Sequence, residues 1–348
     1  MTARCSGSRA EKKAASAGSG LAERPWLCFV WRMIETVSDD LTLTRLRSGG
    51  KPALARALAY LERAPESPGV LALLAEAETA ALGQTLGLTG PPGVGKSTLT
   101  GALIGAYREA GLTVGVIAVD PSSKRSGGAL LGDRVRLASN GGDAGLFIRS
   151  MAARDRLGGL ADQTVAAMVL MRALFDRVLI ETVGVGQSET DVAGVVDTVV
   201  FCVQPGSGDS LQFMKAGIVE VPHLAVVTKA DTGPPARRAL ADLRGALGLS
   251  EAEDGWTVEA RAVSAETREG LPELIAALER HHAWLTETDR LTRRRRAQAE
   301  GWLVEALRER FGTAGLKAAG DLTLPPGASS FTRLAELGQA LTTRLGLG

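Results

Sequence analysis

The sequence predicts an α/β protein whose mostly parallel sheet lies between layers of helices. Apolar segments of strand length alternate with stretches of helical spacing, and the strand-length segments are apolar throughout. A strand that is apolar on both faces is typical of a parallel sheet covered by helices on both sides. The expected strands are 85–89, 114–119, 146–148, 178–180, 198–203, 224–228 and 257–263.

Helical segments are expected on both sides of this core. Across 43–82, leucines recur at spacings of three and four residues, with interruptions at Gly49-Gly50 and at 65–68. Helical spacing resumes from 271 to about 311, and a last helix is expected over 331–345 after Pro325-Pro326. We therefore divide the chain into a tail (1–36), an N-terminal helical segment (37–84), a core domain (85–280) and a C-terminal helical arm (281–348).

Composition is that of an ordinary globular protein. Of 348 residues, 45% are hydrophobic and 23% charged, so a sizeable core is available. The formal net charge of +1 favours neither a nucleic-acid partner nor an anionic membrane surface, and no apolar run approaches the length of a membrane span. Cys5, Cys28 and Cys202 lie far apart, which argues against a disulfide framework and for a cytoplasmic location.

The first residues differ in composition from the rest. Residues 1–20 are rich in Ser, Ala, Gly, Lys and Arg, with Glu11 as the single acid. One interpretation is an organellar transit peptide. We favour a disordered tail or an upstream start, with Met33 as the natural beginning.

A glycine-rich loop carries the clearest chemistry. Gly90-Pro-Pro-Gly-Val-Gly-Lys-Ser-Thr98 fits the Walker A pattern G-x-x-x-x-G-K-S, between an expected strand and an expected helix over 97–108. Its glycines let backbone N–H groups point at phosphate oxygens. We expect Lys96 to reach the phosphates and Ser97 to bind Mg²⁺. The sequence thus predicts a P-loop nucleotide-binding fold. The expected phosphate-binding residues are Gly90, Pro91, Pro92, Gly93, Val94, Gly95, Lys96, Ser97 and Thr98.

Carboxylates terminate two of the expected strands. Asp120 follows 114–119 and Glu181 follows 178–180, and a charge at a buried strand end is costly without a metal or partner. Asp133 lies in a Ser/Gly-rich loop that could fold over the phosphates. We expect Asp120, Asp133 and Glu181 to complete the Mg²⁺ site with Ser97. Helix capping or solvation is the plainer alternative for each acid.

Two further segments concern switching and base recognition. Gly184 follows Glu181 at the spacing of a γ-phosphate-sensing glycine, and Gln187 is a candidate for orienting the attacking water, although a surface role is as plausible. In Thr228-Lys-Ala-Asp231, a carboxylate can accept the ring N–H and amino group of guanine, and the Lys229 stem can cover the base. Ser264-Ala265 ends another strand, where a backbone amide can meet the guanine oxygen.

These strings together resemble the MeaB/ArgK family of GTPases, relatives of the methylmalonic aciduria type A protein. Residues 120–136, from Asp-Pro-Ser-Ser-Lys-Arg to Asp133-Arg-Val-Arg, are similar to the family's switch I region. Residues 181–189 are similar to its switch II. Residues 205–212 and 215–218 resemble the third switch, through which these proteins signal to a partner enzyme. Thr228 stands where the family usually has Asn, and the N-terminal tail lies outside the pattern.

The resemblance implies a biological role. Members associate with adenosylcobalamin-dependent methylmalonyl-CoA mutase, gate delivery of intact cofactor and protect the mutase, and they are homodimers through a C-terminal helical arm. Carried over, Lys96, Asp120, Asp133 and Glu181 form the phosphate and Mg²⁺ site. The expected activity is slow GTP hydrolysis with GTP and Mg²⁺ bound, and the expected partner is a B12-dependent acyl-CoA mutase.

Three alternatives stay open. The first is an ATP-dependent kinase linked to amino-acid transport, which would prefer ATP. Asp231 and Ser264-Ala265 favour guanine instead and so argue against this preference. A nickel or cobalt metallochaperone GTPase usually carries clustered Cys or His ligands, and this chain has only the His281-His282 pair. A nucleotide-gated scaffold cannot be separated from a chaperone by sequence.

Two other features have structural interpretations. The histidines His223, His281 and His282 are expected to be surface or packing residues rather than ligands. The run 293–296, four consecutive arginines, is expected to form a solvated helix face that pairs with neighbouring acids.

Overall fold

The structure, a computed structural model, describes residues 41–80, 82–120, 142–152, 161–182, 192–206, 222–247 and 255–346. Of Asp120 and Ala152 it describes only the backbone. The expected tail therefore lies outside the described residues, and from Thr42 onward the chain packs as one unit.

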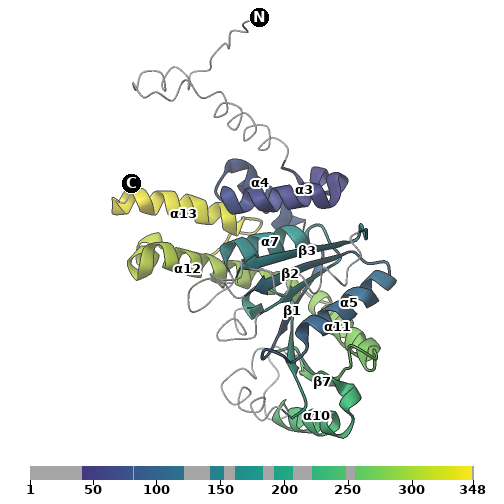
Figure 1. Cartoon of the computed structure of the whole chain (residues 1–348). Coiled ribbons are helices and arrows are strands. Elements are labelled where there is room, and N and C mark those ends of the chain that lie inside the picture. Colours follow the sequence, from purple (N-terminus) through teal and green to yellow (C-terminus); the bar gives the residue numbers. More distant parts are fainter. Residues whose placement is uncertain are drawn as a thin grey trace, which may run out of the picture. The chain divides into compact units, whose positions relative to one another are not determined.

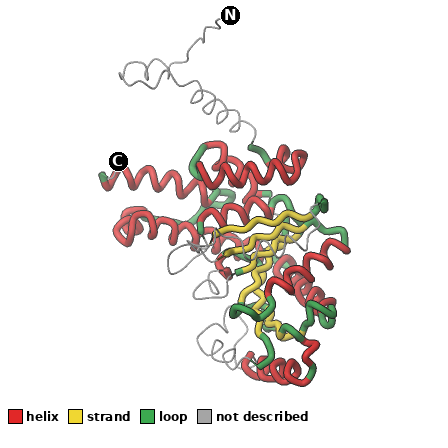
Figure 2. The backbone as a smooth tube through the Cα atoms, viewed as in Figure 1, coloured by secondary structure: helices red, strands yellow, loops and turns green. Residues whose placement is uncertain are grey.

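A seven-stranded, wholly parallel sheet forms the centre of this unit (Figures 1 and 2). Its strand order is β3-β2-β4-β1-β5-β6-β7, so the fold class predicted from the sequence is confirmed. Because all strands run the same way, all their carboxyl ends lie at one edge. The strands are β1 (Gln84–Thr89), β2 (Val114–Asp120), β3 (Leu146–Ala152), β4 (Arg177–Glu181), β5 (Thr198–Val203), β6 (Leu224–Val227) and β7 (Glu259–Ala262).

Alternate strand residues face two different helix layers. Val200 and Cys202 of β5 join the core under α5 (Lys96–Glu109) and α11 (Leu271–Thr286). Phe201 and Val203 face the opposite way and join the core under α10 (Pro234–Leu247). On that second face α7 (Asp162–Arg172) covers β2 and β4. This two-sided burial is the reason that the strands are apolar at every position.

The helical flanks lie together (Figure 1). The N-terminal flank consists of α3 (Leu43–Arg63) and α4 (Pro68–Thr79), and the C-terminal flank of α12 (Arg290–Ala319) and α13 (Ser330–Leu345). The predicted breaks are confirmed, since Gly50 has a left-handed φ of 58° and α4 begins at Pro68. The helix expected to end near 311 continues through a non-helical Gly312 to Ala319.

The C-terminal helices have a core of their own. It contains apolar side chains from α12, α13 and the loop between them: Leu303, Ala306, Leu307, Leu324, Leu334, Leu337 and Leu341. At the start of α13, Ser330 Oγ donates to Glu78 Oε1 of α4 at 2.6 Å, which ties this core to the N-terminal flank. The two flanks, distant in sequence, are therefore one packed layer.

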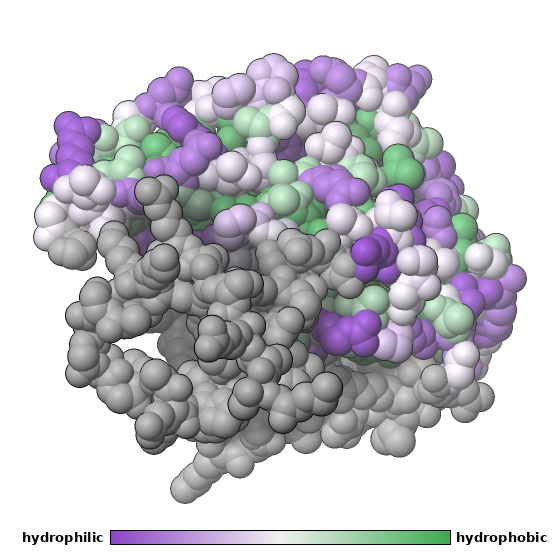
Figure 3. Space-filling view, turned by 90° about the horizontal axis from the view of Figure 1, so that it is seen from above, coloured by the Kyte–Doolittle hydropathy of each residue, from purple (hydrophilic) through white to green (hydrophobic). Residues whose placement is uncertain are grey.

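The described surface is mixed in polarity. In Figure 3, which views this layer from above, hydrophobic residues form separate patches between polar ones. Among the described residues, Leu82 and Leu345 are the large hydrophobic side chains with high exposure, 87% and 40%. None of the helices within the described ranges is both long and apolar enough to cross a membrane.

A buried ion pair joins α12 to the sheet and corrects one prediction. Arg293 and Arg296 do pair with neighbouring acids on a solvated face, Asp289 and Glu300, each at 3.1 Å. Arg295 does not: its guanidinium donates to both carboxylate oxygens of the fully buried Asp197, at 2.7 and 2.8 Å. Helical spacing places Arg295 on the inner face, where the long side chain reaches the sheet.

Asp197 is anchored from several directions. Its Oδ2 also accepts from the Thr85 backbone N at 2.8 Å, and its own backbone N donates to Thr85 Oγ1 at 2.7 Å. Burial would raise the pKa of Asp197, but the hydrogen bonds and charge of Arg295 outweigh burial and hold the pKa below its ordinary value. The carboxylate is therefore ionised in the folded protein at neutral pH.

His223 and His281 pack against each other, which is one of the two roles predicted for the histidines. His281 is fully buried, and its ring lies 4.5 Å from that of His223 and 4.6 Å from that of Trp256, measured between centroids. Its Nδ1 shares a hydrogen bond with Thr198 Oγ1 at 2.8 Å. Burial, reinforced by the charge of Arg294, lowers the pKa of His281 to about 3, so the ring is neutral at physiological pH.

Replacing Arg295 by Met should lower the free energy of unfolding by about 3–5 kcal/mol, because it leaves the Asp197 carboxylate buried without its cation. Adding Asp197→Asn should restore part of that loss. The matched control is Arg296→Met. The side chains of Arg296 and its partner Glu300 are 44% and 30% exposed, so the loss of this pair should change the free energy of unfolding by less than about 1 kcal/mol. Urea unfolding measures all three. Equal losses for Arg295→Met and Arg296→Met would contradict the role of the buried pair.

Candidate functional site

The glycine-rich loop connects the central strand β1 to α5 at the carboxyl edge of the sheet. Gly90, Gly93 and Gly95 have φ angles of 128°, 77° and 95°, all in the region that glycine alone adopts readily. At Gly90 a Cβ would lie 2.2 Å from the carbonyl oxygen of Cys202 in β5. No other residue fits there, so the loop passes directly over the end of the neighbouring strand.

Lys96 folds back into this loop. Only 6% of the residue is exposed, and its ammonium donates to the carbonyls of Gly90 at 2.7 Å and Pro91 at 2.9 Å. It is also the first residue of α5, so its charge lies at a helix N-terminus inside a glycine cradle. This geometry concentrates positive potential where an anion is expected to bind.

Ser97 and Glu181 meet across the loop. Ser97 Oγ donates to Glu181 Oε1 at 2.6 Å, and Glu181, the last residue of β4, is 1% exposed. Hydroxyl and carboxylate oxygens are the kind of ligand that Mg²⁺ prefers, and these two lie close enough together to share one ion. The two residues present therefore fit a divalent cation beside the phosphate loop. Within the described residues no cluster of three His, Cys, Asp or Glu side chains could hold a metal ion.

Several predicted site residues cannot be placed. Asp120 ends β2 at the same sheet edge, with its backbone paired to Ala152, but its side chain lies outside the described residues. Asp133, Gly184 and Gln187 also lie outside them, as do most of the segments that resemble switches. Their roles stay predictions.

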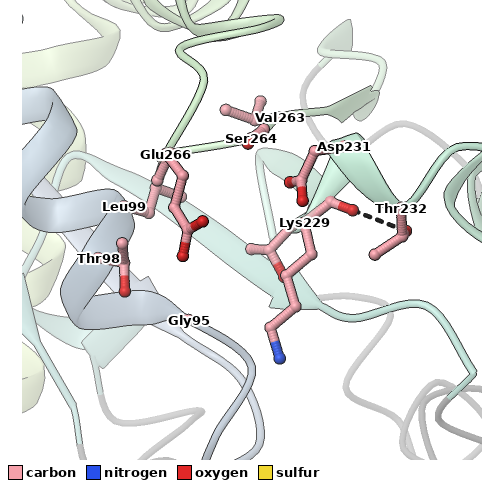
Figure 4. A pocket seen from close by; sticks show the side chains of 11 residues that line it. Gly95, Thr98, Leu99, Lys229, Asp231, Thr232, Val263, Ser264 and Glu266 are labelled. Carbon is pink, nitrogen blue, oxygen red and sulfur yellow. Dashed lines mark hydrogen bonds between the residues drawn. The ribbon is translucent and has the colours of Figure 1, made fainter.

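The residues predicted to read the base line a single pocket next to the loop (Figure 4). Three segments contribute to it: the start of α5 and the segments that follow β6 and β7. Figure 4 shows the carboxylates of Asp231 and Glu266 and the stem of Lys229 around the pocket. The predicted Lys229, Asp231, Ser264 and Ala265 thus come together. The lining residues are Gly95, Thr98, Leu99, Thr228, Lys229, Asp231, Thr232, Val263, Ser264, Ala265 and Glu266.

Thr228 connects this pocket to the phosphate loop. The residue is 5% exposed, and its hydroxyl donates to the carbonyl of Val94 at 2.6 Å and lies 3.0 Å from that of Val203. Position 228, where the family usually has Asn, is therefore occupied by a hydroxyl that is hydrogen-bonded to the loop backbone. The Ala230 backbone N donates to Val263 O at 3.3 Å, which joins the two segments predicted to read the base.

Sequence reasoning missed several lining residues. Thr232 and Glu266 each follow a predicted residue directly, so extending each motif by one position would have found them. Val263 precedes Ser264 in the same way, and Leu99 lies one helical turn from Gly95. Gln204, which contacts Lys229, had no sequence pattern that singled it out.

The glycine loop surrounds a buried lysine and leads into a helix at the carboxyl edge of a parallel sheet, with a pocket beside it. This arrangement is that of a P-loop nucleotide-binding protein. The family described as methylmalonyl Co-A mutase-associated GTPase MeaB matches residues 54–319. The chain belongs to this family and is a GTPase, and the resemblance inferred from the sequence is confirmed.

Individual relatives agree with this assignment. The chain is 39% identical over 311 residues to a putative GTPase of Caulobacter vibrioides, a match that covers 88% of this chain and 95% of that protein. It is 37% identical over 281 residues to the mitochondrial methylmalonic aciduria type A homolog of Mus musculus, covering 78% of this chain and 66% of the mouse protein. The solved structure of an LAO/AO transport system kinase is similar with a TM-score of 0.62 and 28% identity, and covers 88% of this chain and 98% of that one.

Replacing Lys96 by Ala should lower kcat/KM for GTP by about 10²–10³, because a charged donor inside the phosphate cradle is lost. Lys317→Ala, an exposed lysine on α12, is the matched control and should leave kcat/KM unchanged. Phosphate release assays measure both, with thermal unfolding as a check of folding. Normal hydrolysis by the Lys96 variant would contradict the assignment of the loop.

Proposed function

We propose that this GTPase is a chaperone for methylmalonyl-CoA mutase or a related B12-dependent acyl-CoA mutase. In this role it gates delivery of adenosylcobalamin and protects the mutase from inactivation. The observation that carries the proposal is the match of residues 54–319 to a family described as mutase-associated. The name of the mouse relative, which refers to methylmalonic aciduria, supports the same metabolic setting.

In the proposed site, the backbone N–H groups of residues 93–98 and the ammonium of Lys96 bind the phosphates. Ser97 and Glu181, 2.6 Å apart, would hold Mg²⁺ together with Asp120 and Asp133. Bound there, Mg²⁺ would neutralise phosphate charge as hydrolysis proceeds. The chain contributes positioning and electrostatics, with little covalent chemistry of its own.

The pocket is proposed to read guanine. The carboxylate of Asp231 accepts from the ring N–H and the amino group, a pair of donors that adenine does not offer. The Ser264 backbone N already donates to Glu269 O at 2.9 Å, so we assign the neighbouring amide of Ala265 to the guanine oxygen. The stem of Lys229, which lines the pocket (Figure 4), is proposed to cover the base.

Turnover is proposed to depend on the partner. No in-cis arginine is identifiable in the sequence as a catalytic finger, so we expect slow intrinsic hydrolysis that rises when the mutase orders the switch segments around Gly184 and Gln187. We also propose a homodimer through the C-terminal arm over 281–348, as the family resemblance implies, in which the packed helices α12 and α13 present their outer surface.

GTP hydrolysis measured with and without purified methylmalonyl-CoA mutase, with ATP in parallel, tests this proposal. We expect GTP-selective turnover that the mutase accelerates by an order of magnitude or more. The reason is that a partner can stabilise the transition state of hydrolysis, either by supplying a side chain or by positioning those of the GTPase. A cobalamin-independent acyl-CoA enzyme is the control partner and should have no effect.

Each other outcome removes a defined part of the proposal. GTP selectivity without acceleration by the mutase would contradict the partner and leave the guanine site standing. Preference for ATP would contradict the guanine site and bring forward a kinase activity, which the name of the structurally similar transport system kinase makes worth measuring.

A further inference from the structure

The geometry points to Gln204 as a further positioning residue of the guanine-nucleotide site: it holds the ammonium of Lys229 so that the lysine stem lies across the base pocket. This inference rests on the proposed guanine site and does not depend on the mutase. Gln204 directly follows β5, and Lys229 lies two residues beyond the end of the neighbouring strand β6, so the two meet across neighbouring strand ends.

The contact itself is short and charge-assisted. Lys229 Nζ donates to Gln204 Oε1 at 2.6 Å and to the phosphate-loop carbonyl of Gly93 at 3.4 Å. The closer of these two acceptors is therefore the glutamine side chain. A hydrogen bond with one charged partner is shorter and stronger than a neutral one.

The backbone of Lys229 is also unusual. Its φ of 55° and ψ of 45° are left-handed, and among the described residues Arg268 is the one other non-glycine residue with a positive φ. Such conformations cost free energy and persist where the surroundings determine them. Here the residue is fixed at both ends, since its carbonyl accepts from Thr232 Oγ1 at 2.8 Å (Figure 4).

An anchored lysine has a consequence for binding. A lysine side chain has many rotamers, and one that must be ordered when a ligand arrives weakens binding by the entropy that it loses. Gln204 fixes the far end of the stem in advance, so the apolar methylenes already lie along the position of the base. The residue before Gln204, Val203, accepts through its carbonyl from the Thr228 backbone N at 2.8 Å, so the backbones next to Gln204 and Lys229 are hydrogen-bonded to each other.

Binding of fluorescent GDP to the full chain in Mg²⁺ tests the inference through a double-mutant cycle. Gln204→Leu should weaken GDP binding about 3–10-fold, mainly through faster dissociation. Lys229→Met should weaken it at least as much. The double variant should match Lys229→Met alone, because Gln204 acts through the lysine, and a purely structural residue would not show this dependence.

Two controls sharpen the test. Gln204→Glu keeps an oxygen acceptor at the same place and should bind GDP within about 2-fold of the wild type. Gln339→Leu, an exposed glutamine on α13, should have no effect. Wild-type binding by Gln204→Leu, or additive losses in the double variant, would overturn the inference. Failure of the wild type to bind GDP would overturn the guanine site itself, and so the two failures are distinguishable.

Discussion

The close approach of the phosphate loop to the end of β5 is the constraint on which the site depends. Because a Cβ at Gly90 would lie 2.2 Å from the Cys202 carbonyl, the loop can pass over the sheet edge only with glycine there. That path directs Lys96 back into the loop and sets Ser97 against Glu181 at the end of β4. The order of the strands, with β1 between β4 and β5, then decides which side chains the loop meets.

Strand β5 also separates two functions of the fold. Just before the strand, Asp197 is buried against Arg295 and fastens α12 to the sheet. Just after it, Gln204 contacts Lys229 at the nucleotide pocket. The buried ion pair and the His281 cluster thus lie at the amino-terminal side of the strands, away from the residues proposed to bind the nucleotide.

Motifs and periodicity predicted most of the fold and the loops of the site. The strands that are apolar on both faces predicted the parallel sheet, and the full G-x-x-x-x-G-K-S pattern predicted the loop. Both patterns could be read because they depend on local spacing. Side-chain contacts between distant segments were less accessible. The partner of Arg295 is Asp197, about a hundred residues away, and no helical periodicity reveals it. Gln204 is likewise significant only because β5 and β6 are neighbours in space.

The proposed guanine specificity depends on Asp231. The most direct measurement compares GDP and XDP binding to the wild type and to Asp231→Asn. Xanthine carries a carbonyl where guanine has its amino group, so it meets the carboxylate with an acceptor, whereas an asparagine amide can donate to it. We expect the wild type to prefer GDP by roughly 10²-fold or more and the variant to reverse that preference. Equal preference for GDP in both proteins would contradict the account.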